Sequence, residues 1–183
     1  MLTMKQAMLN RHNLRNSICL VMSLVLFFIA FSVEARGVYQ TPEDFLAETF
    51  EQDVPKSKVI WIKGDLRKVI TDILGHKYQG LRIRYWQKQQ RTAWILDEIG
   101  KEEPITFGIV INADKIERVK VLAFRESRGS EIRHRAFTQQ FKDIGLQEMK
   151  LDRHIDGVSG ATMSVSAMTA VATLALYLAT LTS

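Results

Sequence analysis

The sequence predicts a single α+β domain built on a twisted, mainly antiparallel sheet flanked by helices. Segments of β-type sequence follow one another in adjacent pairs instead of alternating with helices, and helical segments come before and after them. Residues 157–183 contain no charged residue and predict a long C-terminal helix. Strands joined by short turns pair antiparallel, whereas a parallel sheet needs a crossover helix between successive strands.

The first element expected is a helix that begins after Thr41. Thr41 can cap the helix, Pro42 suits its first position, and the acidic residues 43–44 suit its positive end. The next elements expected are a strand over 59–62 and a helix over 65–74 that ends at Gly75.

Two hairpins are expected in the middle of the chain. Residues 81–86 alternate apolar and basic side chains, which is typical of a half-buried strand, and residues 92–99 are its expected partner across a turn at 87–90. Strands 105–111 and 116–124 flank turn-forming residues and make the second hairpin.

The last third of the chain is expected to be mostly helical. Ser130 can cap a helix that runs to about Phe141 and is closed by Gly145, and the final helix begins near Thr162. The basic stretch 125–135 also contains acidic residues, so we expect it to be a solvated helix face.

Residues 1–35 are expected to be a secretory signal outside the fold. Basic residues precede an uncharged apolar run over 18–33, which ends in Val33-Glu34-Ala35, with short side chains where a signal peptidase cleaves. The run is shorter than the roughly 20 residues of a usual membrane span. We therefore expect a cleaved, periplasmic protein, with retention of the segment as an N-terminal anchor as the alternative.

Charge and cysteine content exclude several classes of function. Removal of residues 1–35 lowers the formal net charge from +5 to +3, and no cluster of basic and aromatic residues indicates nucleic-acid binding. The only cysteine, Cys19, lies in the predicted signal. The mature chain therefore has no disulfide, thiolate zinc site, iron–sulfur ligands or haem attachment motif, and any electron transfer needs an organic cofactor.

The segment from Asp156 to Thr162 is a turn of small residues that opens onto a helix. Backbone N–H groups at a helix start lack partners and carry the positive end of the helix dipole, so they favour a phosphate. Gly160 and Ala161 leave room for a phosphate ester, and Thr162 offers a hydroxyl. From these residues alone, a phosphate site and a plain capping turn both remain open, and the capping turn is the commoner arrangement.

The segment resembles the flavin-attachment motif of the FMN-binding domain family. That motif is Asp, two variable residues, Ser or Thr, Gly, Ala, and a Ser or Thr that receives FMN. Asp156, Ser159, Gly160, Ala161 and Thr162 fill every required position. The family includes the FMN-carrying subunits of the sodium-pumping NADH:quinone reductase and of its Rnf relatives.

A second similarity lies upstream of the motif. Glu126-Ser127-Arg128-Gly129, followed by Phe137 and Gln140-Phe141, is similar to the stretch before the motif in short, stand-alone members. With this resemblance the domain boundaries are a signal peptide over 1–35, an N-terminal helical and strand extension over 36–74, and an FMN-binding domain over 75–183.

The resemblance implies covalent attachment of FMN to Thr162. A separate FAD:protein FMN transferase, using magnesium, would join the Thr162 oxygen to the phosphorus on the FMN side of FAD, with AMP leaving. Asp156 would shape the turn or be recognised by the transferase, and Gly129 would let its loop approach the flavin closely. The cofactor-binding residues expected are Thr162, Ser159, Gly160, Ala161, Asp156, Glu126, Ser127 and Gly129.

The remaining conspicuous residues are expected to be structural. His76, His134 and His154 show no metal-ligand spacing and no Glu partner pattern, and Trp61, Trp86 and Trp94 fall in predicted strands, where aromatic residues usually pack in the core. No metal ligand or catalytic residue is predicted.

The function expected is electron transfer by an exported flavoprotein that exchanges electrons with a membrane redox partner. The first alternative is a small flavin-dependent reductase that acts directly on a substrate, with Glu126 as its candidate proton donor. The second is an unmodified binding module that retains the fold. We expect an electron-transfer protein and not an enzyme with its own substrate, and the reductase alternative keeps enzyme activity open.

Overall fold

The computed structural model describes residues 37–182, and Gly37–Ser183 form one compact unit. The predicted signal, residues 1–35, lies outside the described residues. The fold is α+β, as predicted, with a five-stranded antiparallel sheet in the order β1-β2-β3-β4-β5. The strands are β1 (Lys58–Trp61), β2 (Arg82–Lys88), β3 (Arg91–Ile99), β4 (Pro104–Asn112) and β5 (Lys115–Phe124).

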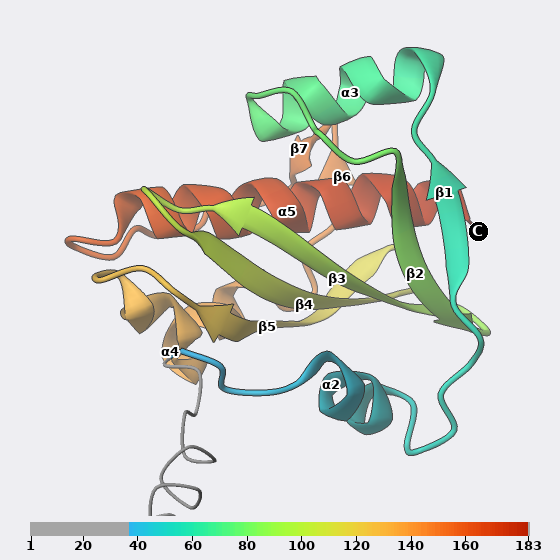
Figure 1. Ribbon diagram of the computed structural model, residues 1–183, viewed down its shortest axis with the longest axis horizontal. Helices are drawn as coiled ribbons and strands as arrows, with labels where there is room; N and C mark the ends of the chain where they lie inside the picture. Colours follow the sequence, from blue (N-terminus) through green and yellow to red (C-terminus); the bar gives the residue numbers. More distant parts are fainter. Residues whose placement is uncertain (1–36, 183) are drawn as a thin grey trace, which may run out of the picture. The chain divides into compact units, whose positions relative to one another are not determined.

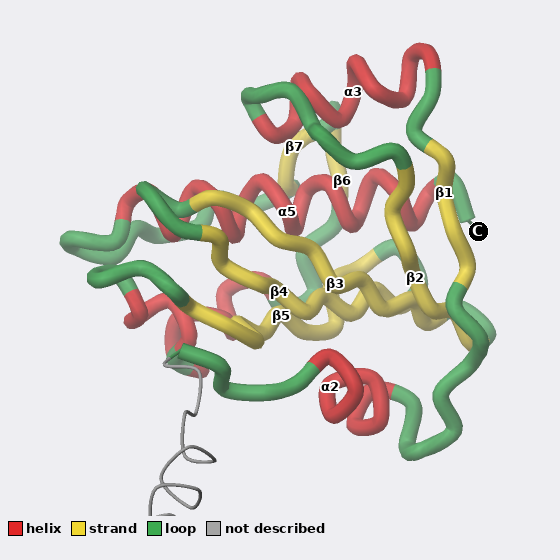
Figure 2. Tube along the Cα trace, in the orientation of Figure 1, coloured by secondary structure: helices red, strands yellow, loops and turns green. Residues whose placement is uncertain are grey.

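Helices cover both faces of this sheet (Figure 1). The short helix α2 (Pro42–Thr49) lies on one face, and the long helix α5 (Thr162–Thr180) crosses the other. On the far side of α5 lie α3 (Gly64–Leu74) and a small hairpin, β6 (Leu146–Gln147) and β7 (Lys150–Leu151). The same layers are visible in the trace coloured by secondary structure (Figure 2).

Alternation along the strands divides the core between the two faces. Ala93, Val110 and Leu122 pack with the apolar side chains of α2, whereas their chain neighbours Trp94 and Ile109 point to the α5 face. Successive side chains of a strand point to opposite faces, so a sheet covered on both sides reads as a continuous apolar run. This accounts for β4, in which every residue from Ile105 to Ile111 is buried.

Local signals at the helix ends and hairpin turns act as the sequence predicts. The Thr41 hydroxyl accepts the N–H of Asp44 at 3.1 Å and caps α2, and Gly75 ends α3 with φ 76° in the left-handed region. The β4–β5 turn places Ala113 and Asp114 at φ 46° and 67°, the geometry of a tight hairpin that matches the twist of the strands.

The helix predicted over 130–141 is wrong as a continuous element. The structure has two 3₁₀ turns, η1 (Ser130–Arg133) and η2 (Gln139–Phe141), separated by the single turn α4 (Arg135–Thr138). His134 is extended between η1 and α4, Ser130 makes no capping bond, and the helical run ends before Gly145. A regular helix would set Ile132 and Phe137 about 140° apart, whereas the break lets both side chains reach the core.

α5 is the only element among residues 37–182 that is long and apolar enough to cross a membrane. Within its most apolar 18-residue stretch, 61% is buried, between the sheet on one side and α3 on the other. A helix that is apolar all round belongs inside a protein or a bilayer. The burial of α5 is that of a helix packed on the sheet.

Two side chains differ from the sequence-based expectations. Trp61 is 56% exposed, because β1 is an edge strand and this side chain lies outside the core, near Arg82. His76 does have a glutamate partner, since its Nε2 lies 2.8 Å from Oε1 of the buried Glu98. The contact joins residues far apart in sequence, so no local spacing pattern could reveal it.

The packing of α2 gives a stability prediction. Phe45 is fully buried against Gly108, where an added Cβ would lie 2.7 Å from the Phe45 ring. Phe45→Ala should lower the free energy of unfolding by about 3–5 kcal/mol, because it removes a buried aromatic ring and leaves a cavity between α2 and the sheet. Chemical denaturation followed by circular dichroism measures this change.

The matched control is Val54→Ala, since Val54 is 39% exposed. It should stay within about 0.5 kcal/mol of the parent protein. An equal decrease in the free energy of unfolding of the two variants would contradict the conclusion that Phe45 stabilises the packing of α2 on the sheet.

Candidate functional site

The N-terminus of α5 opens into a hollow of about 550 Å³. Three segments that are far apart in sequence border it: the loop between β3 and β4, the loop after β5, and the turn that starts α5. Its volume is within the range of about 300–1,000 Å³ typical of small-molecule sites. The lining residues are Lys101, Glu126, Ser127, Arg128, Gly160, Ala161, Thr162, Met163 and Ser164.

A turn without any capping side chain precedes α5. Gly160 has φ 79°, a left-handed conformation that glycine adopts without strain, and the Ala161 N–H bonds to the Val158 carbonyl at 3.0 Å. Ala161 occupies the capping position, but its methyl group cannot accept a hydrogen bond. The first intrahelical bond runs from Val165 N–H to the Ala161 carbonyl at 2.9 Å. The N–H groups of the first turn are therefore available to an anion.

Thr162 is the first residue of α5 and its side chain is exposed at the hollow. Ser164, two residues later in the same helical turn, is only 4% exposed. A hydroxyl that reacts with a large soluble molecule must be accessible, so Thr162 is the better placed of the two.

Gly129 brings the loop after β5 against the start of α5. Its φ is 90°, and an added Cβ would lie 2.7 Å from the Ser164 hydroxyl and 3.3 Å from the Ala161 methyl. Any larger residue would combine a strained backbone with a collision. The sequence predicts a close approach of Gly129 to the flavin, and the close approach in the structure is to the α5 turn.

Glu126 ties the β3–β4 loop to the same hollow. Its Oε1 accepts the backbone N–H groups of Lys101, Glu102 at 2.6 Å and Glu103 at 3.0 Å. These bonds hold the pKa of Glu126 below its ordinary value, and the bond from the Glu103 N–H has the largest effect. Hydrogen bonds to the ionised form favour that form. Glu126 is therefore a carboxylate at neutral pH, which suits a loop anchor and not a proton donor.

Two cations line the hollow on the side of the loops. Lys101 lies 3.3 Å from Glu102 in a surface pair, and no carboxylate pairs with Arg128 among the described residues. Neither residue belongs to the predicted binding set. Arg128 lies inside the stretch Glu126–Gly129, where its positive charge could have indicated an anion site from the sequence. Lys101 reaches the hollow only because the β3–β4 loop folds against it, and Met163 because it follows Thr162 in the first turn of α5.

The predicted site residues fall into three groups. Gly129 lies directly behind the hollow, buried against Ala161 and Ser164. Asp156 and Ser159 are exposed residues of the preceding turn and do not line it; the Asp156 N–H donates to the Gln140 amide at 2.8 Å. The residues that do line it are Glu126, Ser127, Gly160, Ala161 and Thr162.

The lining of the hollow fits the phosphate end of a flavin mononucleotide. Uncapped helix N–H groups, small residues at the turn and two nearby cations all favour an anion. Among residues 37–182, no group of three His, Cys, Asp or Glu side chains is arranged to hold a metal ion.

Comparison with known protein families gives a match that includes the hollow. The model of the FMN-binding domain matches residues 100–177, a span that contains both the Glu126 loop and the Thr162 turn. No curated protein and no solved structure matches the chain significantly. All three segments that border the hollow lie in the matched span, which identifies residues 100–177 as an FMN-binding domain and supports flavin binding by this protein.

Proposed function

We propose that this protein is an exported electron carrier whose FMN is joined through its phosphate to Thr162. The observation that carries the proposal is the exposed Thr162 hydroxyl at the uncapped start of α5, in the hollow that the matched FMN-binding span forms. A helix N-terminus with free N–H groups favours a phosphate for both hydrogen-bonding and electrostatic reasons.

Attachment would proceed from FAD on a separate transferase. A bond forms between the Thr162 oxygen and the phosphorus on the flavin side, and the bond from that phosphorus to the bridging pyrophosphate oxygen breaks. The threonine proton is lost and AMP leaves. The phosphodiester keeps one negative charge, which the α5 N–H groups, Lys101 and Arg128 would stabilise.

The bound flavin would supply one- or two-electron transfer, and the protein would hold it at the start of α5. Ser127 and the Glu126-anchored loop would border the flavin, and Met163 would offer a polarisable apolar surface. The phosphodiester prevents loss of the cofactor where free flavin is dilute, as it is outside the cytoplasm.

The composition of the hollow favours a carrier over a reductase. A reductase that acts on its own substrate needs a proton donor beside the flavin, most often a group whose pKa lies near neutral pH. Among the described residues lining the hollow, Glu126 is the only acid, and its pKa is lowered. No histidine, tyrosine or cysteine accompanies it. We therefore propose that this protein exchanges electrons with another redox protein, for which a membrane partner is the candidate.

Thr162→Ala should abolish attachment. After co-expression with an FAD:protein FMN transferase and export, the parent protein should stay yellow when denatured and exceed its apo mass by FMN minus one water. Thr162→Ala should lack both the colour and the added mass, because no oxygen remains to form the ester.

Thr162→Ser and Ser166→Ala are the matched controls, and both should load. Ser166 is an exposed hydroxyl further along α5. Covalent flavin on a folded Thr162→Ala protein would exclude the proposed linkage.

The N-terminus of the exported protein tests cleavage of the predicted signal. N-terminal sequencing of the same samples should find a start at or near Arg36. A start at Met1 on membrane-extracted protein would favour the anchored alternative.

Direct reduction by nicotinamide should be negligible. The chain has no glycine-rich dinucleotide fingerprint, so excess NADH or NADPH should leave the flavin absorbance unchanged under anaerobic conditions, and dithionite should then bleach it. Fast bleaching by either nicotinamide would support the reductase alternative instead.

Glu126 should show an acid transition as a loop anchor. Its folded pKa is lowered, so the stabilisation it gives the loop is fully present above its ordinary pKa of 4.5 and is lost as the pH falls through the lower folded value. The backbone amide NMR signals of Lys101–Glu103 should shift with a midpoint below 4.5.

Glu126→Gln should remove this transition and loosen the loop at neutral pH, while Thr162 still receives FMN. A midpoint above the ordinary value would show that Glu126 is not held as a carboxylate. Loss of turnover with an electron acceptor, with the flavin still in place, would identify Glu126 as a proton donor and favour the reductase.

A further inference from the structure

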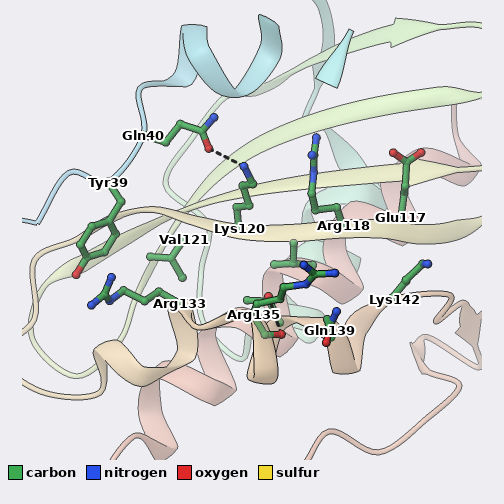
Figure 3. Close-up of a pocket in the computed structure, with 12 residues that line it drawn as sticks. Tyr39, Gln40, Glu117, Arg118, Lys120, Val121, Arg133, Arg135, Gln139 and Lys142 are labelled. Carbon is green, nitrogen blue, oxygen red and sulfur yellow. Dashed lines mark hydrogen bonds between the residues drawn. The ribbon is translucent and has the colours of Figure 1, made fainter. Parts of the chain in front are cut away.

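A second concavity, separate from the flavin hollow, lies along the outer side of β5. It has a volume of about 620 Å³ and shares no lining residue with the hollow. We call it the basic groove, defined by Arg118, Lys120, Arg133, Arg135 and Lys142, which all line it. Figure 3 shows Arg118 and Lys120 on β5 and the other three on the segment from η1 to the residue after η2.

The groove carries a large excess of positive charge. Glu117 is the only carboxylate in its lining, and it already pairs with Arg91 at 2.9 Å. Arg118 and Lys120 share a single carboxylate, Glu48, at 2.7 and 2.6 Å. Such a concentration of one sign of charge in a cleft attracts a ligand of the opposite sign.

The three cations of the helical segment lack acidic partners in the described part of the chain. The Arg133 guanidinium lies 4.7 Å from the centre of the Tyr39 ring, and Arg135 lies against the Gln139 amide. No ion pair joins Arg133, Arg135 or Lys142 to a carboxylate within residues 37–182. Their charges are available to an incoming ligand.

These cations are spread along the groove and do not converge on one point. Arg133 lies beside Tyr39 at one end, Arg135 in the middle, and Lys142 towards the end at Glu117 (Figure 3). One phosphate group would need donors that converge on it. A row of separated cations fits an extended ligand that carries several negative charges.

β5 adds a second feature that fits an extended ligand. It is an outer strand of the sheet, and other segments cover its two ends. Tyr39 N–H bonds to the Leu122 carbonyl at 2.8 Å, and the Ile116 N–H bonds to the Ile144 carbonyl at 2.8 Å. Between these ends, residues 117–121 line the groove, and within the described chain only β4 pairs with them. A strand edge without a backbone pairing partner can receive an extended peptide.

We propose that the basic groove binds an extended acidic segment of a partner protein. Carboxylates of that segment would meet Arg133, Arg135 and Lys142, and its backbone would lie along the middle of β5. The segment that carries Arg133 begins directly after Gly129, so the same stretch of chain borders the groove and the flavin hollow. A protein held in the groove would thus lie close to the loop that packs on the start of α5.

The test is a binding titration on the purified full chain. The probe is a fluorescein-labelled peptide of alternating glutamate and serine, compared with a peptide that has glutamine in place of glutamate. The groove variant is Arg133→Gln, Arg135→Gln and Lys142→Gln combined. The charge-matched control combines Lys56→Gln, Lys63→Gln and Lys68→Gln, three exposed lysines away from the groove.

The groove variant should bind the acidic peptide about tenfold more weakly than the parent, and the control should change binding less than about twofold. The glutamine peptide should not bind. Circular dichroism should show both variants folded, since every substituted side chain is exposed. Because the groove lies outside the flavin hollow, the result does not depend on whether Thr162 carries flavin.

Three results would overturn the proposal. Equal weakening by the groove and control variants would mean that only net charge matters. Binding to vesicles that contain phosphatidylglycerol, lost in the groove variant while the peptide does not bind, would mean a lipid surface. Complete displacement of the peptide by inorganic pyrophosphate at equimolar concentration would mean a site for a compact phosphate ligand.

Discussion

The structure depends on the burial of α5 between the sheet and α3. Side chains on almost every side of this helix are buried, among them Met168, Val171, Leu174 and Leu178. Alanines such as Ala172 and Ala175, both fully covered, let the helix lie close to its neighbours. A charged side chain inside these layers would be costly to desolvate, which explains why the buried positions of α5 carry no charge.

Fixing α5 in this way fixes the position of its first turn. The body of the helix is held by packing on several sides, while Thr162 at its start is exposed and no side chain caps it. The Gly129 loop packs directly on that turn, and the Glu126 carboxylate holds the next loop in place. The well-packed helix α5 thus exposes its first turn and the Thr162 hydroxyl to solvent. The β3–β4 loop and the loop after β5 complete the hollow around that turn. Sites built on rigid elements hold their geometry better than sites built on loops alone.

The two faces of the sheet have separate roles. The α5 face carries the larger core and, at its end, the hollow at the start of α5, whereas the α2 face is closed by a smaller cluster around Phe45. The segments η1, α4 and η2 pack beside β5. Their irregular path brings the side chains of Ile132, Phe137 and Phe141 into the larger core. The same irregular path leaves Arg133, Arg135 and Lys142 along the groove. The basic residues of 125–135 are exposed, as expected from the sequence, but they do not share the face of one helix.

The sequence by itself determined the fold class, the hairpins β2–β3 and β4–β5, the start of α2, the end of α3 and the start of α5 near Thr162, because capping, alternation and turn chemistry act between near neighbours in the chain. Tertiary structure decided what depends on distant residues. It brought Lys101 and the amides that hold Glu126 to the α5 turn, paired His76 with Glu98, left Trp61 exposed on an edge strand, and broke the helix expected over 130–141. In each of these cases burial or a contact across the sheet outweighs the local preference, and such contacts are set only when the chain has folded around α5.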